Sequence, residues 1–156
     1  MVDAKSFRDV LGRFPSGVTV VSCVVEGQTY GMTVSAFSSV SLDPPLVLVC
    51  IAHKASNHAR IASAGRFVVS ILSAEQHALS NRFAGYGGED AVVEWRTEGT
   101  TTPVLSGAVA WLDCTVAQAV DAGDHTVFIG RVEAAAADGG APLIYWRGAY
   151  RTLLGV

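Results

Sequence analysis

The apolar residues of this chain occur in short runs that are separated by turn-forming residues. The longest uninterrupted run, residues 46–52, is closed by His53 and Lys54, whereas a helix that spans a bilayer needs roughly 20 apolar residues. A run this short, preceded by the turn-forming Asp43-Pro44-Pro45, is typical of a fully buried strand. The chain is therefore predicted to consist mainly of strands and to lack a membrane-spanning helix.

The strongest local signal is a β-hairpin. Residues 18–25 are apolar and β-branched, residues 26–28 (Glu-Gly-Gln) form a tight turn, and residues 29–37 are predicted to return as a strand. Further strands are expected at residues 38–42, 66–72, 104–120, 125–136 and 142–153. About eight strands with few, short helices predict a mainly β fold, an antiparallel barrel with Greek-key connections.

Three helices are expected, one before the first strand and two between strands. Phe7, Val10, Leu11 and Phe14 recur at helical spacing and predict an amphipathic helix over residues 3–14, which we interpret as a lid or a packing helix.

The other two helices are indicated by their first residues. Ser56 or Asn57 can cap a helix that runs to residue 63, and the spacing of Ser73 and Gln76 has the form of a capping box for a helix that runs to residue 83. Residues 84–103 contain four glycines and no clear period, which predicts a mobile surface excursion that could also carry function.

Composition limits the possible functions. With 156 residues the chain is expected to form one domain, 1–156. Its formal net charge of −3 provides no basic field for a nucleic acid. The N-terminal segment carries Asp3 and Asp9 and no apolar signal-peptide core, so we expect a cytoplasmic protein.

The cysteines and histidines do not have the spacing of metal ligands. The three cysteines lie far apart without a C-x-x-C pair, which indicates reduced core thiols. The histidines show neither H-x-x-x-H nor H-E-x-x-H spacing, so no metal site is predicted. The sequence also lacks G-x-G-x-x-G, P-loop and G-x-S-x-G motifs, which excludes classical dinucleotide folds and common hydrolases.

Two polar clusters are candidates for ligand binding. Thr33, Ser35, Ser38, Ser39 and Ser41 could bond a phosphate or a flat heterocycle, although the same residues also suit the solvated face of an edge strand. The second cluster follows the apolar run at the start of a predicted helix, where free N–H groups and a lysine could hold an anion or could form an ordinary capped loop. Its members are Lys54, Ser56, Asn57, His58 and Arg60.

His125 and the C-terminal aromatic residues are the remaining candidates. His125 stands at the start of a predicted strand, where it could orient a phosphate, a carboxamide or a proton donor, or could simply bond to Asp124. Residues 145–150 combine aromatic rings with Arg147, as stacking on a flat ligand would need, but such rings also commonly belong to a core.

Seven longer stretches carry a family resemblance. They are FPSGVTVVS (14–22), GMTVSAFSSVSLDPPLVLVCI (31–51), GRFVVSIL (65–72), ALSNRFAG (78–85), AVAWLDC (108–114), GDHTVFIGRV (123–132) and PLIYWRGAY (142–150). In these stretches, in their order and in their spacing, residues 7–153 resemble the short-chain flavin reductases, the reductase components of two-component flavin-dependent monooxygenases. Ala36 stands where that family often has serine, and Ser70 where it often has asparagine.

The resemblance implies a fold, a ligand set and a site. The fold would be an FMN-binding split barrel, usually a homodimer with the flavin in a groove between subunits. His125 would be the catalytic residue at the nicotinamide site, with Arg147, Gly148 and Tyr150 beside it. The residues implied to contact the flavin are Thr33, Val34, Ser35, Ala36, Ser39, Val40, Ile51, Ala52, His53, Lys54, Ser56, Asn57, His58, Arg82 and Phe83.

The implied activity is that of an NAD(P)H:flavin oxidoreductase. It would pass a hydride from NADH or NADPH to FAD or FMN and supply diffusible reduced flavin to a separate monooxygenase component. Two alternatives remain open from the sequence. The first is a flavoenzyme that retains its flavin and reduces a bound acceptor, such as a cobalamin-type or quinone substrate. The second is a non-catalytic module that senses or stores flavin or haem.

Overall fold

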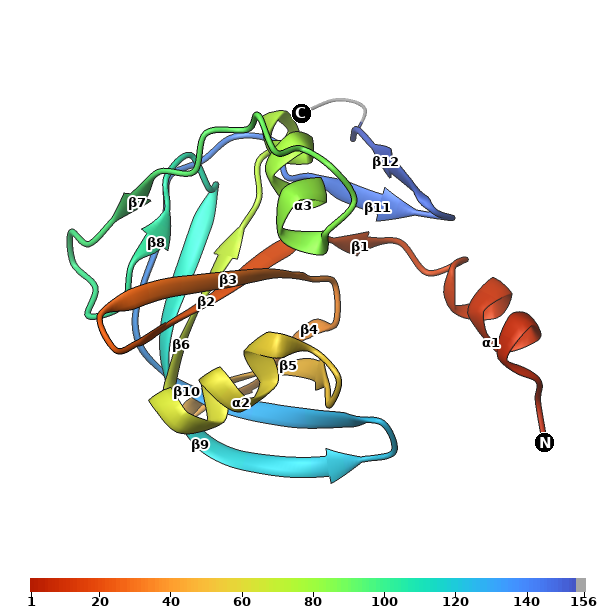
Figure 1. The fold of residues 1–156 in the computed structure, drawn as a ribbon, viewed down its shortest axis with the longest axis horizontal. Helices are drawn as coiled ribbons and strands as arrows, with labels where there is room; N and C mark the ends of the chain where they lie inside the picture. The colour runs from red at the N-terminus through yellow and green to blue at the C-terminus, as the bar shows by residue number, and fades with distance from the viewer. Residues whose placement is uncertain (154–156) are drawn as a thin grey trace.

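A seven-stranded antiparallel sheet forms the body of the molecule in the computed structural model, which describes residues 1–153 (Figure 1). Along the sheet the strands are ordered β3-β2-β6-β9-β10-β5-β4. Consecutive strands β5 and β6 are separated in the sheet by the β9–β10 hairpin, which gives the predicted Greek-key crossover. The strands are β2 (Thr19–Val25), β3 (Gln28–Val34), β4 (Phe37–Leu42), β5 (Pro45–Ala52), β6 (Arg66–Ile71), β9 (Ala110–Ala122) and β10 (His125–Ala137).

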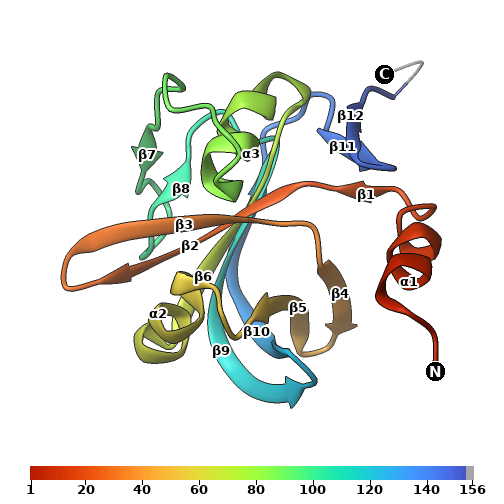
Figure 2. The same ribbon diagram turned by 45° about the vertical axis from the view of Figure 1, so that its right-hand side comes forward.

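The sheet curls without closing, and the reason lies at Ser35 and Ala36. The strand predicted over residues 29–37 is interrupted there, so that β3 and β4 become separate strands. These two strands are the outer members of the sheet, and within residues 1–153 no ladder joins them. The chain therefore passes from one edge of the sheet to the other in two residues and leaves the barrel split (Figure 2).

Strand β5 differs from the prediction that residues 46–52 are fully buried. Its burial alternates: Val47, Val49 and Ile51 are buried in the core, whereas Leu48 and Cys50 are only partly buried. Apolar side chains thus occupy both faces, but only one face is covered by the rest of the domain.

Two small sheets lie beside the main sheet. β1 (Ser16–Gly17), β11 (Ile144–Trp146) and β12 (Ala149–Arg151) form one, and β7 (Trp95–Arg96) pairs with β8 (Val104–Leu105) in the other. The strands predicted over residues 104–120 and 142–153 are therefore each divided in two.

The division of the strand predicted over residues 142–153 has a local cause. Arg147 and Gly148 both adopt positive φ, 50° and 77°, as a two-residue hairpin turn requires. The loop over residues 84–103 likewise contains a short strand, β7, that the sequence did not indicate.

The helices are α1 (Ala4–Leu11), α2 (Ser56–Ala64) and α3 (His77–Ala84), with a 3₁₀ turn at Ala74–Gln76. Asp3 caps α1, with its carboxylate accepting from the amides of Lys5 and Ser6. The predicted cap of α2 was wrong, because Ala55 occupies that position without a side-chain bond. The predicted capping box of Ser73 and Gln76 is present, and in it the Ser73 amide donates to Gln76 Oε1 at 3.1 Å.

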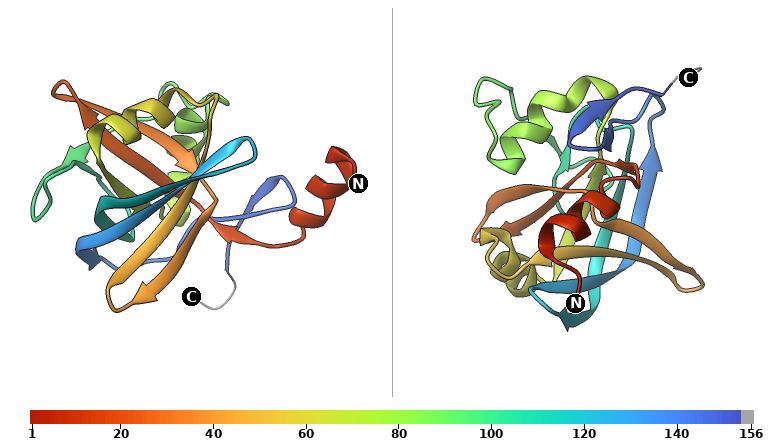
Figure 3. Two further views of the ribbon diagram at one scale, coloured as in Figure 1. Left: turned by 90° about the horizontal axis from the view of Figure 1, so that it is seen from below. Right: turned by 90° about the vertical axis from the view of Figure 1, so that its right-hand side faces the viewer.

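Helix α1 buries none of its residues. Phe7, Val10 and Leu11, and Phe14 beyond the helix end, are all exposed. Figure 1 and the left view of Figure 3 show α1 projecting from the body of the barrel. The helix expected to be a lid or packing element therefore has no apolar partner among residues 1–153.

Two apolar clusters form the core. One lies inside the curled sheet under α2 and includes Phe67, Phe128 and Ile61, all at most 1% exposed. The other includes Leu72 and Leu105, with Phe83 of α3 packed against it. Among residues 1–153, none of the helices has both the length and the apolar character that crossing a bilayer requires.

Candidate functional site

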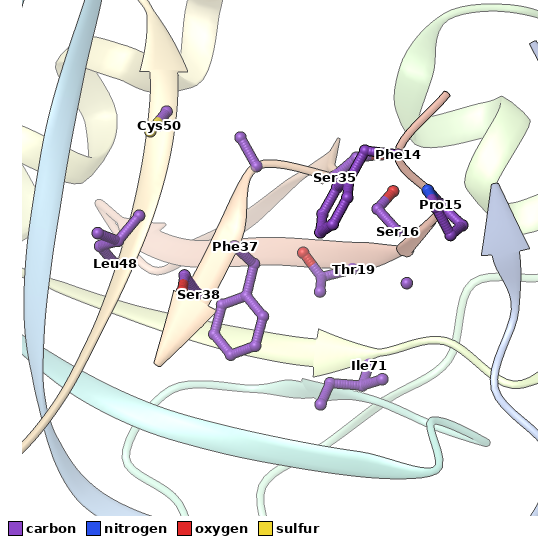
Figure 4. A pocket seen from close by; sticks show the side chains of 12 residues that line it. Phe14, Pro15, Ser16, Thr19, Ser35, Phe37, Ser38, Leu48, Cys50 and Ile71 are labelled. Atoms are coloured by element: carbon purple, nitrogen blue, oxygen red, sulfur yellow. The ribbon is translucent and has the colours of Figure 1, made fainter. Parts of the chain in front are cut away.

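A large cavity lies at the split of the barrel. It has a volume of about 560 Å³ and is walled by the segment preceding β2, the Ser35–Ala36 break and strands β4, β5 and β6 (Figure 4). Its lining consists of Phe14, Pro15, Ser16, Gly17, Thr19, Ser35, Ala36, Phe37, Ser38, Leu48, Cys50 and Ile71.

The cleft is neutral and combines apolar side chains with a few hydroxyl groups. Hydroxyls of Ser16, Ser35 and Ser38 stand among the apolar side chains of Leu48 and Ile71 (Figure 4), and no Asp, Glu, Lys, Arg or His belongs to the lining. Apolar walls with a few hydroxyls suit a flat, largely apolar heterocycle that has hydrogen-bonding groups at its edge. These residues therefore fit an isoalloxazine ring.

A second cavity of about 210 Å³ shares Ser35 with the cleft and is rich in tyrosine. Tyr86, Tyr145 and Tyr150 line it together with Thr33. The Tyr150 hydroxyl donates to Asn81 Oδ1 at 2.7 Å. The hydroxyl cluster and the C-terminal rings, which are far apart in the sequence, thus meet in one place.

The residues expected on β3 and β4 occupy different environments. Ser35 and Ala36 line the cleft. Thr33 Oγ1 donates to the Ser80 carbonyl at 2.7 Å, and the Val34 side chain faces the core. Ser39 and Val40 are exposed on β4, where the ladder to β5 is irregular between Ser39 and Ser41.

The residues expected after β5 are similarly divided. The Ile51 side chain is fully buried, so only its backbone can contact a ligand. Ala52 pairs with His125 across the β5–β10 ladder. His53, Lys54 and Ser56 are exposed.

Asn57 and His58 have partners within the protein. Asn57 is 3% exposed and accepts a hydrogen bond from Arg60 at 2.9 Å. His58 Nε2 lies 2.7 Å from Thr126 Oγ1, and its ring packs on Phe128 with the centroids 5.5 Å apart.

Arg82 and Phe83 of α3 also contact the protein itself. Arg82 donates to the carbonyls of Glu89 and Ala91 at 2.6 and 2.7 Å, which ties down the loop after α3. Phe83 packs close above Gly31, where an added Cβ would lie 2.9 Å from the ring, and contacts Trp95 with centroids 5.8 Å apart.

His125 is held by its neighbour but lies apart from the other expected nicotinamide residues. Its Nδ1 donates to Asp124 Oδ1 at 2.7 Å, and this bond lowers the pKa of the Asp124 carboxyl. Arg147 and Gly148 form the β11–β12 turn beside α1, where the Arg147 amide donates to the Gly12 carbonyl. The β9–β10 turn and the β11–β12 hairpin stand at opposite ends of the molecule in Figures 1 and 2.

Several lining residues were not expected from the sequence. The segment Phe14-Pro15-Ser16-Gly17 forms one wall, and Leu48, Cys50 and Ile71 form another. A signal for Leu48 and Cys50 did exist, because residues 46–52 are apolar on both faces although only one face of an antiparallel strand need be buried.

The position of Cys50 in the cleft predicts an order of thiol reactivity. Burial raises the pKa of all three thiols, that of Cys114 to about 12. Cys50 lines the cleft, whereas Cys23 and Cys114 are fully buried. Since the thiolate is the reactive form, alkylation by iodoacetamide is expected to be slow near neutral pH and to accelerate as the pH rises. Peptide mass spectrometry should find Cys50 modified first. Earlier modification of Cys23 or Cys114 in the folded protein would contradict this packing.

Comparison with known proteins gives a consistent result. Residues 11–154 match the family model described as "Flavin reductase like domain". The chain is 45% identical over 151 residues to an NADH-dependent flavin reductase of Rhodococcus sp, covering 94% of this chain and 84% of that protein. It is also 45% identical to the reductase component of the flavin-dependent trigonelline monooxygenase of Acinetobacter baylyi, covering 95% of this chain and 48% of that protein.

Solved structures agree with the sequence matches. The flavin reductase PheA2 superposes with a TM-score of 0.93 at 40% identity, covering 97% of this chain and 99% of that one. The NADH:FAD oxidoreductase SgcE6 of Streptomyces globisporus, in complex with NAD and FAD fragments, gives a TM-score of 0.89 at 36% identity, covering 99% and 97%.

The extent of the match differs among relatives. The chain spans about half of the trigonelline monooxygenase reductase component and of a probable flavin reductase of Rhizobium meliloti, at 48% and 49% of their lengths. It spans 85% of the FMN reductase (NADH) SmoA of Agrobacterium fabrum, to which it is 43% identical. With a family model matched over nearly all of its residues and relatives more than 40% identical along most of their length, the chain belongs to the flavin reductase-like domain family.

Proposed function

We propose that this chain is an NAD(P)H:flavin oxidoreductase that binds FAD or FMN in the cleft at the split of the barrel and releases it reduced to a separate monooxygenase component. The observation that carries the proposal is the neutral, hydroxyl-lined cleft beside Ser35 and Ala36. Relatives named as NADH-dependent flavin reductases and as reductase components of monooxygenases support it, and they favour NADH as the donor.

The chain's own residues would bind and orient the two ligands. Ser16, Ser35 and Ser38 offer hydroxyls to the polar edge of the isoalloxazine, and Leu48 and Ile71 exclude water from its faces. When bound, the flavin supplies the chemistry by accepting a hydride from the nicotinamide. Because the lining carries no charged side chain, the affinity should be moderate, as a diffusible product requires.

His125 is proposed to orient the nicotinamide. Its Nδ1–H is held by Asp124, so in the neutral ring Nε2 is left as a hydrogen-bond acceptor. Such an acceptor suits the NH₂ group of a carboxamide. No protein nucleophile is needed for this reaction.

We also propose that the protein is a homodimer. The exposed apolar residues of α1 have no partner within residues 1–153. One chain also keeps the turn between β9 and β10, which His125 follows, apart from the turn between β11 and β12 (Figure 1). A second copy could cover the helix and bring the two turns together. We further propose one domain over residues 1–156 and, since all three cysteines are free, a reducing compartment such as the cytoplasm.

The decisive experiment follows the loss of absorbance at 340 nm with each pairing of NADH or NADPH with FAD or FMN, and then separates protein from flavin by gel filtration. Rapid oxidation with flavin eluting free is the expected result. Oxidation with flavin retained through turnover would indicate an enzyme that reduces another bound acceptor, and absence of oxidation would indicate a binding module.

A cleft variant connects this activity to the cavity. Ala36→Trp should fill the cleft and weaken flavin binding roughly tenfold, the equivalent of overpacking by about 1–2 kcal/mol. Ala135→Trp, at an exposed position of β10 outside the cleft, is the matched control. Flavin should also slow alkylation of Cys50 in the wild type, a readout that does not depend on turnover.

A further inference from the structure

Three of the four histidines gather at one end of the sheet, around the turn between β9 and β10. His53 follows β5, His58 belongs to α2, and His125 begins β10. The rings of His53 and His58 meet edge to face with centroids 5.2 Å apart. Among residues 1–153 no group of three or more His, Cys, Asp or Glu is arranged to hold a metal ion, so the cluster needs another explanation.

A hydrogen-bonded chain links α2 to this turn. Thr126, 3% exposed, donates its hydroxyl proton to Asp121 Oδ1 at 2.8 Å. The hydroxyl oxygen of Thr126, Oγ1, lies 2.7 Å from His58 Nε2. A hydroxyl has one proton, so His58 must be the donor in this second bond. The chain therefore runs from His58 Nε2–H through Thr126 to the Asp121 carboxylate and selects the Nε2–H tautomer of His58.

The turn is also held from the β5 side. The His53 amide donates to the Asp124 carbonyl at 3.0 Å, and His53 Nε2 lies 3.6 Å from Asp121 Oδ1. Asp124 in turn accepts from His125 Nδ1. Both ends of the turn that carries His125 are thus tied, one to α2 and the other to the end of β5.

We propose that Thr126, with His58 and Asp121, is a positioning network that holds the turn bearing His125 at a fixed place over the Ala52–His53 backbone. This inference rests on the proposed function, because that function assigns His125 the role of orienting the nicotinamide. Thr126 contacts neither the cleft nor the tyrosine-lined cavity, so its effect passes through the turn. The buried hydroxyl ties down an Asp121 side chain that is itself 85% exposed, whereas the side chains of surface turns are usually mobile.

The test removes only the hydroxyl. Thr126→Val keeps the shape of the side chain but breaks both bonds. It should raise the KM for NADH and lower kcat/KM roughly tenfold by misplacing His125. Flavin affinity should stay close to wild type, and Tm should fall only modestly, because the part-buried Nε2–H of His58 loses its acceptor. Thr126→Ser should restore the parameters. Thr115→Val is the matched control, because Thr115 lies on the same hairpin but donates to Glu133 away from the turn.

A second readout does not use turnover. Long-range ¹H–¹⁵N correlation of the imidazoles should show His58 as the Nε2–H tautomer in the wild type, and Thr126→Val should shift the signals of both His58 and His125. Wild-type kinetics in Thr126→Val would overturn the inference, as would an equal loss of NADH turnover, flavin binding and Tm, which marks a purely structural threonine. If the wild-type protein does not oxidise NADH, the proposed function is wrong, and the NMR signals of His125 become the test of the network. Signals of His125 that stay unchanged in Thr126→Val would overturn the network.

Discussion

His125→Ala is expected to lower kcat/KM for NADH oxidation by roughly 100-fold, the size of effect that follows when a reacting group loses its alignment by about 1 Å. The His125 imidazole is hydrogen-bonded to Asp124 at 2.7 Å, and His125 pairs with Ala52 across the β5–β10 ladder. Because His125 does not line the cleft, its removal takes away a contact with the nicotinamide and leaves the cleft unchanged. Turnover should fall and the apparent KM for NAD(P)H should rise. Steady-state kinetics at saturating flavin provide the measurement.

The same variant should bind flavin almost as well as the wild type, because His125 does not line the cleft. Flavin fluorescence titration tests this separately from turnover. His77→Ala is the matched control, since His77 is an exposed histidine on α3 and has no proposed part in binding. Wild-type kinetic parameters in His125→Ala would remove this residue from the mechanism.

Gly130→Ala is expected to cause the largest loss of stability, about 3 kcal/mol, with a fall in Tm of roughly 10 °C for a chain of this size. An added Cβ at Gly130 would lie 2.5 Å from the tip of the Phe67 ring and 2.9 Å from Cys114 Cβ. Phe67 and Cys114 are fully buried, so neither can move aside without disturbing the core. Thermal unfolding followed by circular dichroism gives the Tm.

Gly17→Ala is the control for this substitution. Gly17 has no neighbouring atom within 4 Å of an added Cβ, and its φ is not positive. Its Tm should therefore stay near that of the wild type. Equal Tm values for Gly130→Ala and the wild type would mean that β10 packs less closely on Phe67 than the structure shows.

The strands and their turns could be predicted from the sequence because their signals are local. The hairpin predicted from residues 18–25 and 29–37 follows from a β-branched run and a glycine turn. It is confirmed, although its second strand ends at Val34. The divisions of the predicted strands were missed where tertiary contacts outweigh local propensity. Residues 104–120 read as one alternating stretch, yet Leu105 pairs with Trp95 of the preceding loop and Ala110 begins a new strand.

The candidate site could be predicted only in part. Ser35 and Ala36 were expected to contact a ligand, and they line the cleft. The wall formed by Phe14-Pro15-Ser16-Gly17 was not foreseen, because nothing in that segment indicates which strand it will face. The partners of His58 and Arg82 were hidden for the same reason: Thr126 is 68 positions from His58, and the loop carbonyls that hold Arg82 have no sequence signal.

By itself the sequence determined that the fold is mainly β, that the chain turns at residues 26–28 and 43–45, and which family it resembles. Only the tertiary structure decided what each apolar face covers. In β5, Val47, Val49 and Ile51 meet the core, whereas Leu48 and Cys50 meet a cleft, because the break at Ser35 and Ala36 separates β3 from β4 there. The hydrophobicity of a strand face indicates only that this face will be shielded from water. The curl of the sheet determines whether protein or ligand covers it.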